Sequence, residues 1–266
     1  MKKLIVLSSI LFAAHSYAHQ PYVSTLVPTT ENSRTPIIAG YAEETLNSEA
    51  ALKKAVFTIV DPDAKSSQIT PESQLKSATV FDLDLPKDGT YKITSSLGYP
   101  IKYALYNKEW HMYLDMPADK APKQSAREYV IPSDFKKAPS LVEVQREWTI
   151  QSYITKKHTT EIKETEVAPR DVTFSVHPNQ IKVNQDVTVH VHDHAKNEHI
   201  EHAIVSITPI GESDDKAKSV TTNAEGEAVV RFDRPGQYLL VASQKFNPKV
   251  KPTTQYYTIV SLHIAN

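Results

Sequence analysis

The feature that most constrains the fold is a series of short runs of β-branched and aromatic residues in the carboxy-terminal third of the chain. Turn residues separate these runs at short intervals, for example in Asn223-Ala-Glu-Gly226 and Arg234-Pro-Gly236. Such an alternation of runs and turns is typical of antiparallel strands. Six or seven strands over roughly a hundred residues predict an immunoglobulin-like sandwich. The runs span 172–176, 187–191, 203–207, 228–232, 238–242 and 256–264.

The amino-terminal part also favours strands, apart from one short helix that we expect over Ser48–Lys54 with Asn47 or Ser48 as its cap. Lys87-Asp-Gly-Thr-Tyr91 resembles Arg234-Pro-Gly-Gln-Tyr238, because each places a turn glycine two residues before a tyrosine that opens a strand. We therefore predict an all-β protein with two immunoglobulin-like β-sandwich domains in tandem. The further strand candidates are 37–39, 56–60, 79–85, 91–94 and 103–113.

The first eighteen residues have the pattern of a cleaved signal peptide. Met1-Lys2-Lys3 is basic, Leu4–Ala14 is mostly apolar, and Ser16-Tyr17-Ala18 supplies the small residues of a cleavage site. The apolar run is too short to span a membrane, and no later segment is long and apolar enough to do so. We therefore expect a periplasmic protein with no membrane anchor.

Composition divides the mature chain into two predicted domains. Lys156–Pro169 is charged and poor in apolar residues, so we place the linker there. The amino-terminal sandwich domain is expected over 19–157 and the carboxy-terminal one over 170–266. Within the first of these, between the Lys87–Tyr91 and Arg234–Tyr238 motifs, the polar and proline-containing stretch Pro117–Pro139 is expected to be a loop or excursion.

Composition also leaves histidine as the main source of chemistry. The 266 residues include no cysteine, which excludes disulfides, thiolate metal sites and cysteine nucleophiles. A formal net charge of −1 gives no support for a nucleic-acid partner. Neither an HExxH nor a GxSxG motif occurs, so we do not expect an enzyme. Eleven histidines remain to be explained.

Five of the histidines fall between residues 190 and 202, and this density predicts a metal site. Strand alternation sends Val187, Val189 and Val191 to the core and the intervening residues to the outer face. Imidazole nitrogens suit nickel, cobalt, copper or zinc, and argue against calcium or magnesium. The candidate ligands in this hairpin are His190, His192, His194, His199 and His202.

The expected register of the hairpin brings two of its strands together at one point. A turn over Ala195–His199 would pair residue 192 with 202, so that His202 lies opposite His192 on the outer face. A site made from His190, His192 and His202 is then geometrically available. In this register Asp193 and Glu201 point inward, and we leave them out as first-choice ligands. A solvated strand face that binds metal only incidentally, or that responds to pH, is the alternative interpretation.

Cleavage after Ala18 would make His19 the new amino terminus. Its α-amine and ring nitrogen can then bind one metal ion together, and a second histidine would complete a histidine brace, an arrangement that suits copper. Cleavage after Ser16 would abolish this site. A chance position after a routine cleavage is the alternative.

Several segments between Arg146 and Ala242 resemble a known bacterial family, and Ala18-His-Gln-Pro-Tyr22 is similar to its start. The segments are Ile150-Gln-Ser-Tyr-Ile-Thr155, Val176-His-Pro-Asn-Gln-Ile181, Thr222-Asn-Ala-Glu-Gly226 and Pro235-Gly-Gln-Tyr238. The family is a domain-of-unknown-function family described as the periplasmic component of cobalt and nickel transport. The resemblance implies a secreted two-sandwich protein that handles divalent transition metals, with His19 as a candidate ligand.

The chain departs from this family at one position that matters for metal binding. The family often has a Gly-His pair after its first strand, where this chain has Gly40-Tyr41. A partner for His19 would have to come from elsewhere, such as His111 or His158. No spacing argument chooses between these two.

Three functions follow from these observations. The leading hypothesis is a periplasmic protein that binds a divalent transition metal, with nickel or cobalt favoured over copper and zinc, for sequestration or for delivery to a metal-uptake transporter. The second is a copper protein or enzyme that uses the His19 brace. The third is a non-catalytic interaction or adhesion module whose histidines are incidental.

Overall fold

The computed structural model describes residues 20–72, 75–163, 169–194 and 196–266, which fall into two compact units. The smaller unit holds Ile101–Glu143 with Pro248–Pro252, and the larger unit holds the other described residues. Strands and 3-10 turns are the regular elements of these residues, with no α-helix among them. The predicted all-β class is thus confirmed. The 3-10 turns are η1 Ala118–Lys120, η2 Gln124–Ala126, η3 Pro132–Asp134, η4 Pro178–Gln180 and η5 Asp214–Lys216.

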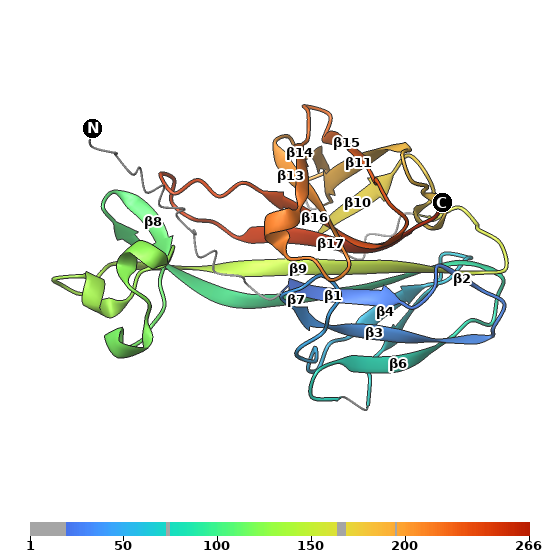
Figure 1. The fold of residues 1–266 in the computed structure, drawn as a ribbon, viewed down its shortest axis with the longest axis horizontal. Helices are drawn as coiled ribbons and strands as arrows, with labels where there is room; N and C mark the ends of the chain where they lie inside the picture. Colours follow the sequence, from blue (N-terminus) through green and yellow to red (C-terminus); the bar gives the residue numbers. More distant parts are fainter. Residues whose placement is uncertain (1–19, 73–74, 164–168, 195) are drawn as a thin grey trace, which may run out of the picture. The chain divides into compact units, whose positions relative to one another are not determined.

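Three sheets build the larger unit (Figure 1). The first outer sheet consists of β1 Gln20–Thr25, β3 Arg34–Ala42 and β6 Thr79–Asp84. The second outer sheet consists of β10 Arg170–Phe174, β11 Asp186–Asp193, β12 Glu198–His199 and β15 Glu227–Arg231. The central sheet runs in the order β14 Lys218–Thr221, β13 Ala203–Pro209, β16 Gly236–Gln244, β17 Gln255–Ile264, β9 Leu141–Lys156, β7 Gly89–Tyr106, β4 Phe57–Val60 and β5 Ser66–Ile69, with β2 Thr29–Thr30 on β9.

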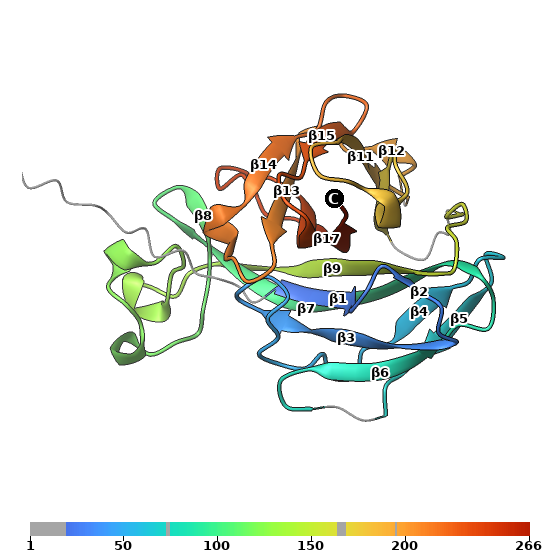
Figure 2. The ribbon, with the colours of Figure 1, turned by 45° about the vertical axis from the view of Figure 1, so that its right-hand side comes forward.

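The central sheet serves two sandwiches, one on each face. Strand β16 shows this directly, because Leu239 and Val241 pack in one core while Leu240 and Ala242 pack in the other. Both views of the ribbon place β1, β3 and β6 on one side of β9 and the sheet containing β10 and β11 on the other (Figures 1 and 2). Burial on both faces explains why β16 is a nearly continuous apolar run and does not alternate.

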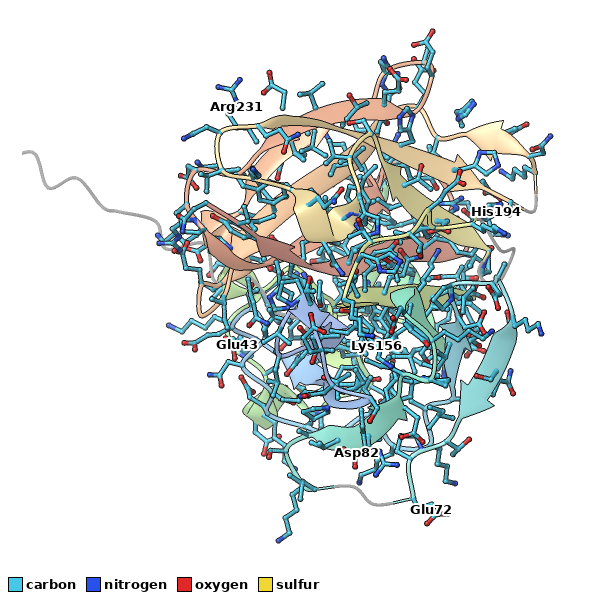
Figure 3. All side chains as sticks on the ribbon, turned by 90° about the vertical axis from the view of Figure 1, so that its right-hand side faces the viewer. Glu43, Glu72, Asp82, Lys156, His194 and Arg231 are labelled. Atoms are coloured by element: carbon cyan, nitrogen blue, oxygen red, sulfur yellow. The ribbon has the colours of Figure 1, made fainter. Side chains whose placement is uncertain are left out.

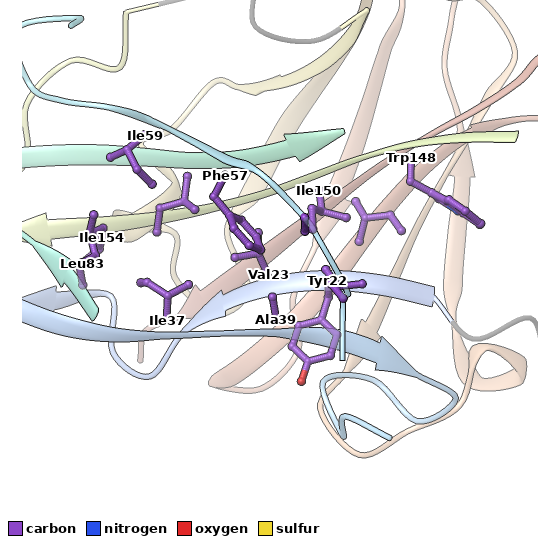
Figure 4. Packing of buried hydrophobic residues seen from close by; sticks show 14 of the residues in the cluster. Tyr22, Val23, Ile37, Ala39, Phe57, Ile59, Leu83, Trp148, Ile150 and Ile154 are labelled. Atoms are coloured by element: carbon purple, nitrogen blue, oxygen red, sulfur yellow. The ribbon is translucent and has the colours of Figure 1, made fainter. Parts of the chain in front are cut away.

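The first core lies between the first outer sheet and the central sheet (Figure 4). Its residues come from strands far apart in the chain, including Val23 of β1, Ile37 of β3, Phe57 of β4 and Ile150 of β9. Ile259 of β17 also belongs to it, since β17 pairs in parallel with β9. The amino-terminal sandwich is therefore completed by strands from the carboxy-terminal end.

The second core lies between the other face of the central sheet and the second outer sheet. Tyr153 of β9 packs there with Val172 of β10, Val189 of β11 and Leu262 of β17. All six strand candidates of the carboxy-terminal third form strands here, and this half is the immunoglobulin-like sandwich that the sequence predicts. The predicted domain limits at 157 and 170 stay a prediction.

The helix expected over Ser48–Lys54 is absent, so that prediction is wrong. Residues 48–54 contain an isolated bridge, in which the Tyr41 backbone N–H donates to the Ala50 carbonyl at 2.8 Å. Lys54 has a left-handed backbone with φ 59°. A helix of seven residues is marginal in water, so pairing with the end of β3 decides the conformation.

The smaller unit contains β8 Glu109–Met112, which pairs with the end of β7, and the turns η1 to η3. Arg127 and Asp134 form a nearly buried ion pair with an N–O distance of 2.6 Å. Phe135 packs edge-on against Tyr106. The stretch Pro117–Pro139, expected as a loop or excursion, lies in this unit and carries the three 3-10 turns.

Candidate functional site

The histidine-rich segment lies on β11 and in the hairpin that follows it. Along β11, Val187, Val189 and Val191 are buried, while His190 and His192 are partly exposed. The predicted alternation of valine and histidine faces is confirmed. Asp193 also points inward as predicted, where its carboxylate pairs with Arg170 at 3.1 Å and both side chains are nearly buried.

The register of the hairpin differs from the prediction. His199 lies opposite His192, and Glu198 lies opposite Asp193, so the hairpin closes between Asp193 and Glu198. The Asp193 side chain accepts a hydrogen bond from the Lys196 backbone N–H at 3.2 Å, and Asn197 takes a left-handed backbone with φ 53°. An aspartate that bonds the turn backbone and an asparagine with positive φ both favour this tight turn. The predicted pairing of His192 with His202 is wrong.

His202 lies outside the paired part of the hairpin. It has a left-handed backbone with φ 60°, and its side chain is 78% exposed. Its Nε2 lies 3.3 Å from a carboxylate oxygen of Glu201, which is itself exposed and does not point inward as predicted. The structure thus replaces His202 with His199 as the cross-strand neighbour of His192.

Three imidazoles come together at the end of this hairpin, from His192, His194 and His199. The ring centroids of His192 and His194 are 4.9 Å apart, and those of His192 and His199 are 5.3 Å apart. With metal–nitrogen bonds of about 2.0–2.1 Å and nitrogens about 1.1 Å from the ring centre, two rings on one ion have centroids about 5 Å apart. We call these three residues the imidazole cluster.

His194 has a ring nitrogen that protein groups leave unused. Its Nε2 is buried without a hydrogen bond to any residue of the described ranges, although buried polar atoms are normally paired. The backbone N–H of His194 donates to the Pro169 carbonyl at 3.0 Å, which anchors this residue beside β10. His194 follows one end of β11, and Arg231 of β15 lies opposite Asp186 at the other end. Figure 3 shows the two residues well apart.

The ring nitrogens of the cluster do not yet converge on one point. Across residues 20–72, 75–163, 169–194 and 196–266, no three histidine, aspartate or glutamate side chains are arranged to hold a metal ion. The ring planes of His192 and His194 are inclined by 73°, and those of His192 and His199 by 65°. Metal binding at the cluster therefore requires rotation of the imidazoles about their side-chain bonds.

The remaining predicted ligands lie elsewhere. His190 Nδ1 is 3.5 Å from a carboxylate oxygen of Glu227 on β15, and its ring borders a separate cavity. His19 lies outside the described residues, which begin at Gln20 in β1. Of its two suggested partners, His111 packs edge-on against Tyr106 in the smaller unit, and His158 is exposed after the end of β9.

Sequence reasoning missed a buried polar group on β7, β9 and β10. Lys92 Nζ lies 2.6 Å from a carboxylate oxygen of Asp171, and Gln151 donates a hydrogen bond to the other oxygen. Tyr153 is buried beside them. Their only sequence signal is a polar residue inside a strand that is buried on both faces, such as Lys92 between Tyr91 and Ile93.

The fold and this cluster define a class, an all-β protein of immunoglobulin-like sandwiches that carries a group of imidazoles on a hairpin. The chain belongs to the family described as "Domain of unknown function (DUF4198)", which matches residues 13–245. No curated protein matches the chain. None of the helical elements in the described ranges has the length and apolar character for a membrane crossing.

Among solved structures, the chain is similar to Escherichia coli alpha-2-macroglobulin domains MG0-NIE-MG1, with 10% identity, a TM-score of 0.23, and coverage of 92% of this chain and 64% of that one. Chicken CNTN1 domains FN1–FN3 match with 10% identity and a TM-score of 0.26, and the match covers 92% of this chain and 65% of that one. The chain thus spans slightly less than two thirds of these two structures. The D0-D1 domain of intimin matches with 10% identity, a TM-score of 0.23, and coverage of 91% and 97%.

Proposed function

We propose that this protein binds a divalent transition-metal ion through the imidazole cluster of His192, His194 and His199. The observation that carries the proposal is the spacing of the three rings, 4.9 and 5.3 Å between centroids, which matches two imidazoles on one ion. The unpaired Nε2 of His194 supports it, because a metal would satisfy that buried atom. Nitrogen ligands favour nickel, cobalt, copper or zinc.

The biological role that we propose is the uptake or sequestration of nickel or cobalt in the periplasm, with delivery to a metal-uptake transporter. The signal-peptide pattern of residues 1–18 and the resemblance to a family described for cobalt and nickel transport support this role. The exposed position of His199 gives a metal a route to the cluster. Protonation of the imidazoles at low pH removes the donor lone pairs and releases the ion.

Calorimetric titration tests the site. Processed protein without a histidine tag is freed of metal with a chelator and titrated with nickel chloride or cobalt chloride at neutral pH. We expect His192→Ala/His194→Ala/His199→Ala to weaken binding by at least about tenfold, which corresponds to about 1.4 kcal/mol. The matched control is His158→Ala/His202→Ala, which removes exposed histidines outside the cluster. Equal affinities of the cluster variant and the wild type would disprove the proposal.

A further inference from the structure

A cavity of about 380 Å³ opens between the central sheet and the edge of the second outer sheet, apart from the imidazole cluster. Its size lies in the range of small-molecule sites. Lys92 of β7, Tyr153 of β9 and Asp171 of β10 line its inner end. These three side chains come from three strands, so the backbone fixes their positions.

The ion pair at the inner end leaves part of the ammonium group unused. Lys92 and Asp171 have side-chain exposures of 4% and 3%, so water does not screen the pair. Asp171 accepts from Lys92, from Gln151 and from the backbone N–H of Val172. Lys92 donates only to Asp171 among the described residues. An ammonium group has three N–H donors, so two of them have no described acceptor.

The hydroxyl of Tyr153 is a second unused donor at the same end. Tyr153 is 3% exposed and makes no hydrogen bond to any residue in the described ranges. Burial and the negative charge of Asp171 raise the pKa of the Tyr153 hydroxyl well above its usual 10.0, so the group keeps its proton. The hydroxyl is absent from the fully buried unpaired atoms of the described residues, so it is open to the cavity and can donate to a molecule there.

The rest of the cavity sets the charge and polarity that an occupant needs. Phe174, Val176 and Ile162 give it apolar walls. The Lys92–Asp171 pair is neutral as a unit, while the Glu161 carboxylate contributes a negative charge at an exposed position. Because the Lys92–Asp171 pair is neutral, the Glu161 carboxylate gives the wall a negative charge, which disfavours an anion relative to a neutral molecule.

His177 on the wall does not offset this negative charge. Its Nδ1 accepts a hydrogen bond from the Asn179 backbone N–H at 3.1 Å, and its Nε2 lies 3.0 Å from the Thr90 hydroxyl. Burial lowers the pKa of the His177 imidazole below 6.5, so the ring is neutral at pH 7. Both nitrogens are therefore occupied, and His177 offers no charge to a ligand.

We propose that this cavity binds a small uncharged molecule that has an acceptor oxygen at one end and an aliphatic body, such as an alkyl amide. The oxygen accepts hydrogen bonds from Lys92 and Tyr153, and the aliphatic body packs against Phe174, Val176 and Ile162. This site does not depend on metal binding at the imidazole cluster.

Ligand-observed NMR with hexanamide as the probe tests the site, with hexanoate as a probe of similar shape and negative charge. We expect saturable hexanamide binding and hexanoate binding at least about tenfold weaker. Tyr153→Phe removes only the hydroxyl and is expected to weaken hexanamide binding by about fivefold. The control is Tyr113→Phe in the smaller unit, and a thermal melt verifies that both variants fold.

Three results would overturn the proposal. They are the absence of hexanamide binding to the wild type, equal or tighter binding of hexanoate, and unchanged hexanamide affinity in a folded Tyr153→Phe variant. None of these results bears on the imidazole cluster, which the metal titration tests separately.

Discussion

Tyr91 and Tyr238 make the same hydrogen bond in the two halves of the chain. The Tyr91 hydroxyl donates to the Lys87 carbonyl at 2.9 Å, and the Tyr238 hydroxyl donates to the Arg234 carbonyl at 3.1 Å. Each bond spans four residues around a glycine of positive φ, 126° at Gly89 and 130° at Gly236. This is the tyrosine corner known from immunoglobulin-like sandwiches, and it occurs once in each half.

Replacing either tyrosine by phenylalanine is expected to lower the free energy of unfolding by about 1 kcal/mol, because a backbone carbonyl loses its donor. The two substitutions should have effects of similar size, because each hydroxyl makes a second hydrogen bond. Tyr91 accepts from the Lys87 backbone N–H at 2.8 Å, and Tyr238 donates to a carboxylate oxygen of Asp233 at 3.3 Å. Urea unfolding followed by circular dichroism measures both. Tyr99→Phe, at an exposed position, is the control. Tyr91→Phe as stable as the wild type would contradict the structural role.

The Lys92–Asp171 pair is expected to be sensitive to the loss of one partner. Asp171→Ala leaves a buried ammonium without its counter-ion and should lower the unfolding free energy by about 3–5 kcal/mol. Removing both charges in Lys92→Met/Asp171→Leu should cost less than Asp171→Ala alone. Arg34→Ala is the matched control, since Arg34 and Asp84 form an ion pair with side chains 61% and 70% exposed. A change of about 1 kcal/mol or less is expected there.

The pH dependence of stability should report on His177. Burial lowers the pKa of His177 in the folded protein below its ordinary 6.5, so the unfolded chain binds the proton more tightly. The contribution of neutral His177 to the free energy of unfolding is fully present above about pH 6.5. This contribution is lost as the pH falls through the pKa of His177 in the folded protein. His177→Gln should therefore weaken the loss of stability on acidification, measured by urea unfolding at several pH values. His202→Gln should keep the wild-type dependence, and identical curves for both variants would refute this assignment.

Single substitutions distinguish the two registers of the histidine hairpin. His199→Ala should weaken nickel binding by at least about tenfold, whereas His202→Ala should leave it nearly unchanged. The reason is that His199, and not His202, lies opposite His192. The opposite result would restore the pairing that the sequence alone suggests. Calorimetry with nickel chloride on the metal-free protein measures both affinities.

The local strand pattern and the two tyrosine corners were predictable because each depends on short-range features. Alternation along β11 fixes which of its residues face the core, and Gly89 and Gly236 mark turns whatever their distant neighbours are. The hairpin register was not predictable from the strand pattern. The position of the turn depends on a hydrogen bond that the Asp193 carboxylate accepts from the Lys196 backbone N–H. A slip of this kind changes which histidines meet.

Features that depend on distant segments were also missed. The Ser48–Lys54 stretch has good local helix signals, yet its backbone pairs with Tyr41. Lys92 and Asp171 are separated by 79 residues, so no local pattern joins them. The imidazole cluster is a different case, because its residues lie in one hairpin and only the register decides that His192 lies beside His194 and His199.

The parallel pairing of β9 with β17 has a consequence for synthesis. Ile259 of β17 belongs to the first core, so the amino-terminal sandwich lacks part of its interior until residue 259 has left the ribosome, more than a hundred residues after the start of β9. Until then, β9 would present an apolar edge and invite aggregation, a hazard of slow non-local pairing. A holding chaperone during synthesis would therefore benefit this protein more than one whose halves mature one after the other.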